Sequence, residues 1–194
     1  MLARVSAPRL VTVLFTDLVA STETVARLGP EAGQAWRLGH LDLLREALAG
    51  TGGRELQAFG DGLLVLFEAP SAAVACAAAM QQRVARANAR RDALAETAVR
   101  VGIALGEATE DEQGVHGLVV VEAARLCAAA KGGQVLASAM VETLSAGRAK
   151  QRFSALGALE LKGLLAPVSV VEVEWRDAGP SAPIPFPPAL ADAA

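Results

Sequence analysis

Two aspartates stand where apolar segments of the chain end or turn. Asp17 directly follows the apolar run LVTVLFT at residues 10–16, and Asp61 lies in the triplet GDG at residues 60–62, between two further strand-like runs. Carboxylates held at strand ends can share hard cations such as Mg²⁺, which take their remaining ligands from water and substrate phosphates. The pair is therefore a candidate two-metal site for phosphoryl transfer, although an aspartate in such a turn can also serve the turn geometry alone.

The residues that follow Asp17 suggest a place for phosphate. The segment LVAST, residues 18–22, leads into a helix predicted from Ser21 to about Leu28, with Ser21 or Thr22 as its cap. Backbone N–H groups at a helix start lack intrahelical partners, and the helix dipole favours an anion there. A strand, a carboxylate and a phosphate cradle are thus contiguous in the sequence.

The elements that must position these residues form an α+β pattern. Alternating and apolar runs predict strands at 10–16, 54–59, 63–67, 98–108 and 134–138, and further strands near 153, near 160 and at 168–175. Helical periodicity predicts helices at 21–28, 30–50, 70–91, 119–130 and 139–147, while the polar run EDEQG at 110–114 is predicted to be a loop. This order favours a ferredoxin-like antiparallel or mixed sheet, covered by helices on one face.

Length and composition are consistent with one domain. The chain has 194 residues, of which 53% are hydrophobic and 20% charged, so we expect a single core at residues 10–176. A lead at 1–9 precedes it, and the proline-rich tail at 177–194 is predicted to be disordered. Because this domain and the tail use up the chain, we expect any sensor or effector on a separate chain.

Charge and hydropathy exclude several classes of function. A net charge of −3 offers no broad basic face for nucleic acid. No apolar run reaches the roughly 18 residues of a membrane span, and the N-terminal segment lacks the apolar stretch of a secretory signal. We therefore expect a cytoplasmic protein. In it, Cys76 and Cys127 are expected to be small buried residues that neither form a disulfide nor bind zinc.

Five segments together carry a resemblance to a known family. They are VTVLFTDLVAST, FGDGLLVLF, VRVGIALGEA, GLVVVEAARL with GGQVLAS, and LGALELKGLLAPVSVVEV. In this order, over about residues 9 to 175, the sequence resembles the class III adenylate/guanylate cyclase catalytic domain. The resemblance implies a head-to-tail homodimer with composite sites at its interface, ATP or GTP as substrate, and two Mg²⁺ or Mn²⁺ ions in each site.

The resemblance also assigns roles to individual residues. Asp17 and Asp61 match the two metal-binding aspartates, and the carbonyl of Leu18 matches a backbone metal ligand. Arg125, in EAARL, matches the arginine that stabilises the transition state, and Lys162, in LKG, matches a lysine that contacts the triphosphate. Such a site has the ribose 3′-hydroxyl attack the α-phosphate, and needs no covalent nucleophile.

Three positions depart from the family pattern. Gln57 replaces the lysine that commonly reads adenine, Gly114 falls on the partner position for the base, and Val121 replaces the asparagine that orients the ribose. A glutamine amide both donates and accepts hydrogen bonds, so it could read either purine. His116, close to Gly114, could supply a polar group instead, but His40 and His116 are both expected to be ordinary loop or surface histidines.

Three functional hypotheses follow. The first is an active cyclase, supported by Asp17, Asp61, Arg125 and Lys162. The second is a degenerate module that binds nucleotide or a partner with little or no turnover, suggested by the three departures. The third is a general ferredoxin-like binding domain for RNA or a metabolite, which explains the element order but not the ordered motifs.

Overall fold

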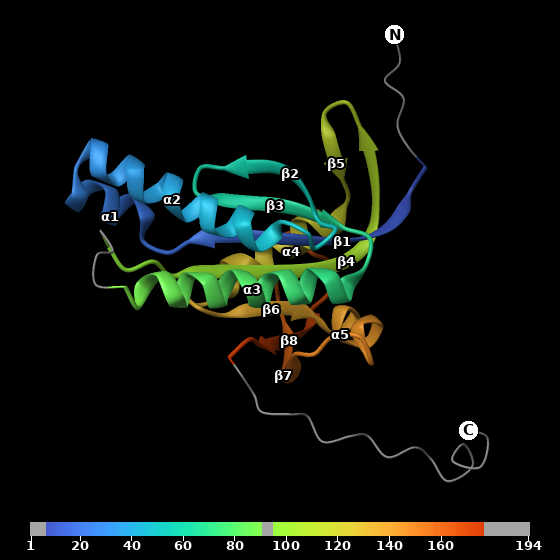
Figure 1. The fold of residues 1–194 in the computed structure, drawn as a ribbon. Coiled ribbons are helices and arrows are strands. Elements are labelled where there is room, and N and C mark those ends of the chain that lie inside the picture. Colours follow the sequence, from blue (N-terminus) through green and yellow to red (C-terminus); the bar gives the residue numbers. More distant parts are fainter. Residues whose placement is uncertain (1–6, 91–94, 177–194) are drawn as a thin grey trace.

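The computed structural model describes residues 7–90 and 95–176, and the predicted disorder of the tail lies outside these residues. Figure 1 shows the elements around one central sheet. In chain order they are β1 (Arg9–Leu18), α1 (Ser21–Leu28), α2 (Pro30–Leu48), β2 (Arg54–Phe59), β3 (Gly62–Phe67), α3 (Pro70–Asn88), β4 (Val99–Asp111), β5 (Gly114–His116), α4 (Leu118–Ala129), β6 (Val135–Ser138), α5 (Ala139–Ser145), β7 (Arg152–Leu159) and β8 (Val168–Glu174).

The sheet contains the predicted ferredoxin-like core. Its strands lie in the order β2-β3-β1-β4-β6-β8-β7, with β5 paired to β4. Strand β1 is antiparallel to both β3 and β4, whereas β4 and β6 are parallel and connected through α4. The mixed α+β class predicted from the sequence is confirmed, with β6, β8 and β7 extending the four-stranded core β2-β3-β1-β4.

Helices cover both faces of this sheet, so the predicted one-sided covering was wrong. Helices α2, α3 and α5 pack on one face through a core that includes Leu44, Met80 and Val141. Helix α4 packs on the opposite face through Val119, Ala123 and Leu126, and it lies behind the sheet in Figure 1. Strand β3 is therefore buried along its whole length, which explains why its sequence GLLVLF is continuously apolar rather than alternating.

Two predicted boundaries also differ from the structure. The polar run at 110–114 is no simple loop, because β4 continues to Asp111 and pairs with β5 in a hairpin arm. The strand predicted around residue 153 is β7, which runs to Leu159 with a register irregularity between Ala155 and Gly157, whereas the strand predicted near 160 is wrong, because residues 160–167 form a loop. Backbone pairing can extend polar strands beyond the core, and a bulge interrupts the alternation from which strand ends are predicted.

The helices fit their predicted positions closely. Helix α3 ends at Asn88 rather than near 91, and Arg91 lies outside the described residues. Among residues 7–90 and 95–176, no helix combines the length and the apolar character needed to cross a membrane.

Glycine at position 102 allows α4 to lie directly on the sheet. A Cβ atom there would overlap the Ala123 carbonyl oxygen and the Cys127 amide nitrogen, both backbone atoms of α4. We expect Gly102→Ala to lower the free energy of unfolding by about 1–3 kcal/mol, the usual cost of overpacking, as measured by urea denaturation.

Gly39→Ala is the matched control for this substitution. Gly39 lies within α2, and a Cβ atom there meets nothing within 4 Å. Alanine at this helical position should raise stability by up to about 1 kcal/mol. Equal effects of the two alanine substitutions would contradict the packing argument.

Candidate active site

The fold brings the two aspartates together at one end of the sheet. Asp17 is the penultimate residue of β1, and Asp61 lies in the turn between β2 and β3. The turn is fixed to β1 by a hydrogen bond of 2.8 Å from the Leu63 amide to the Thr16 hydroxyl. The side chains of Asp17 and Asp61 are both partly exposed, so the end of β1 and the hairpin tip present two accessible carboxylates.

The glycines on either side of Asp61 have separate structural roles. Gly60 has a φ of 64°, a left-handed conformation that suits glycine in a two-residue hairpin turn. At Gly62, a Cβ atom would overlap the Thr16 carbonyl oxygen and lie 3.5 Å from the Asp17 Cα atom. The glycine at position 62 therefore permits the close approach that makes the two carboxylates neighbours.

Arg100 is a site residue that the sequence analysis missed. It lies opposite Asp17 in the antiparallel β1–β4 pairing, and its Nε donates to Asp17 Oδ2 at 2.9 Å. Its Nη2 donates to the same oxygen, and its Nη1 donates to the Ala128 carbonyl oxygen at 3.3 Å. In the sequence, Arg100 is recognisable only as an arginine near the start of an otherwise apolar strand. The register of β1 and β4 was needed to show that it lies opposite Asp17.

The start of α1 follows the carboxylate as predicted, but it is capped differently. Ala20 is the N-cap, with a left-handed φ of 53°, and no side-chain hydrogen bond caps the helix. The predicted capping by Ser21 or Thr22 is therefore wrong, since Ser21 is already the first helical residue. Left-handed alanine is uncommon, and strained residues of this kind concentrate at functional sites.

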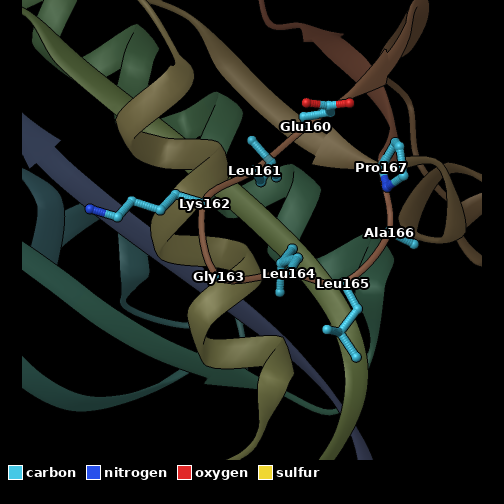
Figure 2. A pocket seen from close by; sticks show the side chains of 8 residues that line it. All are labelled: Glu160, Leu161, Lys162, Gly163, Leu164, Leu165, Ala166 and Pro167. Carbon is cyan, nitrogen blue, oxygen red and sulfur yellow. The ribbon is translucent and has the colours of Figure 1, made fainter.

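Arg125 and Lys162 are also brought together, on the face of the sheet covered by α4. Arg125 of α4 donates from Nε to the Lys162 carbonyl oxygen at 2.9 Å. Lys162 belongs to the loop 160–167, which lines an open hollow of about 510 Å³, and Figure 2 shows its side chain extending past α4. Both side chains are exposed, and the hydrogen bonds of the described residues do not join them to the two aspartates.

The three altered positions lie on different elements. Gln57 is exposed on β2, beside a register irregularity, and Val121 is exposed near the start of α4. Gly114 begins β5, where its amide donates to Asp111 Oδ1 at 3.2 Å. His116 Nε2 lies 3.0 Å from the same oxygen, and this contact holds the pKa of the Asp111 carboxyl below its usual value. His116 is exposed, as expected.

His40 contradicts its prediction as a surface or loop histidine. Its side chain is buried in α2 with 2% exposure, because it shares a four-residue spacing with Trp36 and Leu44 on the inner face of the helix. Burial lowers the pKa of His40 to about 4. The negative charge of Asp61 and a hydrogen bond with the Asp61 backbone act in the other direction and raise it. The helical spacing was the signal that could have identified this buried position.

The donor set at the strand end suits a hard divalent cation. Within the described part of the chain, no group of three or more His, Cys, Asp or Glu side chains is placed to hold a metal. Two carboxylates with open access match ions such as Mg²⁺, which keep several water or phosphate ligands, better than they match a closed zinc site. The residues present therefore fit a metal that is shared with a substrate.

Comparisons with known proteins bear on the whole fold. A family model described as the adenylate and guanylate cyclase catalytic domain matches residues 5–172. The serine/threonine-protein kinase pkn2 of Myxococcus xanthus is 34% identical over 163 residues, which cover 83% of this chain and 19% of the relative. The chain spans about a fifth of the length of the curated relatives it matches.

Two solved structures share the fold closely. The adenylyl cyclase CyaB from P. aeruginosa has a TM-score of 0.77 at 23% identity, covering 91% of this chain and 100% of that chain. The adenylate/guanylate cyclase/hydrolase from Silicibacter pomeroyi also has a TM-score of 0.77, at 25% identity, covering 88% of this chain and 98% of that chain.

Both cysteines are buried, and we expect both thiols to be unreactive in the folded protein. Burial raises the pKa of Cys76 to about 11 and that of Cys127 to about 12, where the Asp17 charge contributes further. At pH 8 the thiolate fraction is then about one in a thousand or less. Native protein should release no colour with Ellman's reagent, whereas protein in urea should titrate two thiols.

The single variants Cys76→Ala and Cys127→Ala assign this signal, since each should titrate one thiol in urea. Rapid reaction of either thiol in the native protein would show that it is accessible.

Proposed function

The chain belongs to the adenylate and guanylate cyclase catalytic domain family, and we propose that it converts ATP, with GTP as a second substrate, into the 3′,5′-cyclic nucleotide and pyrophosphate. The observation that carries the proposal is the placement of Asp17 beside the Asp61 turn, through the contacts of Gly62 and Leu63 with Thr16. Two partly exposed carboxylates, held at the end of β1 and in the adjoining turn of a cyclase-family domain, support this proposal.

Asp17 and Asp61, with the carbonyl of Leu18, are the proposed ligands of two Mg²⁺ or Mn²⁺ ions. When bound, these ions would lower the pKa of the ribose 3′-hydroxyl and neutralise negative charge on the triphosphate. The start of α1 follows directly, and the first amides of a helix can bind phosphate. Ser21 and Thr22 are the proposed phosphate-binding residues there, through backbone amides and hydroxyls that no cap interaction engages.

Arg125 and Lys162 are the proposed cationic groups for the developing charge. In the reaction the ribose 3′-hydroxyl loses its proton to water and its oxygen bonds to the α-phosphorus, while the bond from this phosphorus to the oxygen that bridges to the β-phosphate breaks and pyrophosphate leaves. Negative charge grows on the phosphoryl and leaving oxygens, where a positioned guanidinium or ammonium stabilises it. The hydrogen bond from Arg125 Nε to the Lys162 carbonyl oxygen holds the two residues close together, with both side chains exposed.

The site is proposed to be composite, with the carboxylates from one copy and the cations from another. Arg125 bonds Lys162 rather than either aspartate, although Asp17 lies on the same face of the sheet as α4. Large apolar side chains are exposed near these elements, including Phe59 at 43%, Leu118 at 66% and Leu165 at 105%. A homodimer would cover such side chains and bring the two half-sites together.

Base selectivity is proposed to be relaxed. Gln57 is exposed on β2, and its amide can donate to one purine edge or accept from another. Gly114 offers no side chain, and the exposed Val121 side chain cannot hydrogen-bond a ribose. The three departures at Gln57, Gly114 and Val121 also favour the second candidate function, a module that binds nucleotide or a partner with little or no turnover.

Mixing two inactive variants tests the composite site. Asp17→Ala and Arg125→Ala should each fall to about 1% of wild-type cyclase activity or less, because each removes a group that the transition state needs. After mixing and subunit exchange, half of the dimers are mixed and each holds one intact site. Activity should recover to about a quarter of the wild-type value. Absence of recovery, with both variants dimeric by sedimentation, would contradict a shared site.

Product analysis over all four nucleoside triphosphates separates the two candidate functions. Wild type with Mn²⁺ should form cyclic product from ATP and GTP, with a ratio of kcat/KM values within about tenfold, since one amide serves both bases. Asp17→Ala measures the background. Metal-dependent triphosphate binding by calorimetry, with product no greater than this background, would favour the binding module.

A further inference from the structure

Arg100 forms an ion pair with Asp17, one of the proposed metal ligands. Two guanidinium nitrogens, Nε and Nη2, donate to the single oxygen Oδ2 of Asp17. The Arg100 side chain is 31% exposed and the Asp17 side chain 34%, so the pair lies at the boundary between core and solvent. The proposed metal ligand is therefore already neutralised by a cation of its own chain.

Arg100 is held in this place from two sides. Its strand position is opposite Asp17 in the β1–β4 register, and its Nη1 bonds the Ala128 carbonyl near the end of α4. Carbonyl groups at a helix C-terminus attract cations. The guanidinium is thus anchored by backbone and helix as well as by the carboxylate, which distinguishes it from a flexible surface arginine.

We propose that Arg100 is an internal counter-ion that competes with the divalent metal for Asp17. The inference rests on the proposed function, because it takes Asp17 as a metal ligand. An oxygen that accepts two guanidinium N–H groups has both lone-pair directions engaged, and two cations at one carboxylate repel each other. Metal binding through Oδ2 therefore requires Arg100 to leave that oxygen, and repulsion by the guanidinium lowers the affinity of the whole carboxylate for metal in the absence of nucleotide.

A purely structural role for Arg100 predicts the opposite metal behaviour. If the pair only held β1 and β4 in place, its loss would loosen the site and weaken metal binding. Competition predicts that removing the positive charge strengthens metal binding while the fold loses some stability. Metal affinity without nucleotide separates these cases, and it needs no turnover.

The test is a Mn²⁺ titration of the full chain by electron paramagnetic resonance, without nucleotide. Arg100→Gln should bind Mn²⁺ about tenfold more tightly than wild type, on the scale of a partly buried ion pair. Arg100→Lys keeps the positive charge but loses the forked guanidinium geometry. Its affinity for Mn²⁺ should lie between those of wild type and Arg100→Gln. Asp17→Asn should abolish the gain when combined with Arg100→Gln.

Arg83→Gln is the matched control, because Arg83 bonds Glu46 at 2.8 Å on a surface formed by α3 and α2. It should leave the Mn²⁺ affinity unchanged. If Arg100→Gln does not fold, as judged by circular dichroism, Arg100→Lys carries the test.

An affinity of the Arg100 variants equal to or below that of wild type overturns the proposal. Binding that does not depend on Asp17 overturns it as well, together with the metal assignment. If the Arg100 variants gain Mn²⁺ affinity through Asp17 while wild type forms no cyclic product, the counter-ion stands and the proposed turnover fails.

Discussion

The approach of the β2–β3 turn to β1 is the constraint on which the candidate site depends. Gly62 lies so close to the Thr16 carbonyl that no side chain fits there, and the Leu63 amide bonds the Thr16 hydroxyl at 2.8 Å. These contacts involve mostly backbone atoms, which a buried sheet holds rigidly. The spacing of Asp17 and Asp61 is therefore set by the fold itself, and the carboxylates keep their access to solvent because they lie at its edge.

A second close contact links this edge to the cationic residues. Gly102 of β4 lets the backbone of α4 lie directly on the sheet, at Ala123 and Cys127. The same helix carries Arg125 on an exposed side, and its Ala128 carbonyl reaches Arg100. Helix α4 thus carries Arg125 and contacts Arg100, and Gly102 sets its position on the sheet as Gly62 sets the position of the Asp61 turn.

The sequence predicted what depends on local pattern. The apolar run before Asp17, the GDG turn and the periodic helices led to the right elements, because period and turn chemistry are local properties. Arg100 was missed because its partner is 83 residues away and appears only with the strand register. The polar β4–β5 arm and the bulged β7 were misjudged since backbone pairing, rather than side-chain pattern, extends them.

His40 and the helix start show a different limit. His40 shares the spacing of Trp36 and Leu44, yet its histidine type favoured a surface position, and tertiary burial overrode that preference. At the start of α1 the chain takes a left-handed turn at Ala20 instead of the expected side-chain cap. Both departures lie next to the two carboxylates, and local sequence rules commonly fail where a site is built, which agrees with the candidate site.

The net charge of the candidate site bears on whether a metal ion binds there alone or together with a nucleotide. Asp17, Asp61 and Arg100 together carry one net negative charge, with the guanidinium already on Asp17. On the proposed assignment, one divalent ion would leave the cluster with a net positive charge and a repelled arginine. A triphosphate brings several negative charges to the same place, so it would offset both metals and the displaced guanidinium. The arrangement therefore favours joint binding of metal and nucleotide over binding of metal alone.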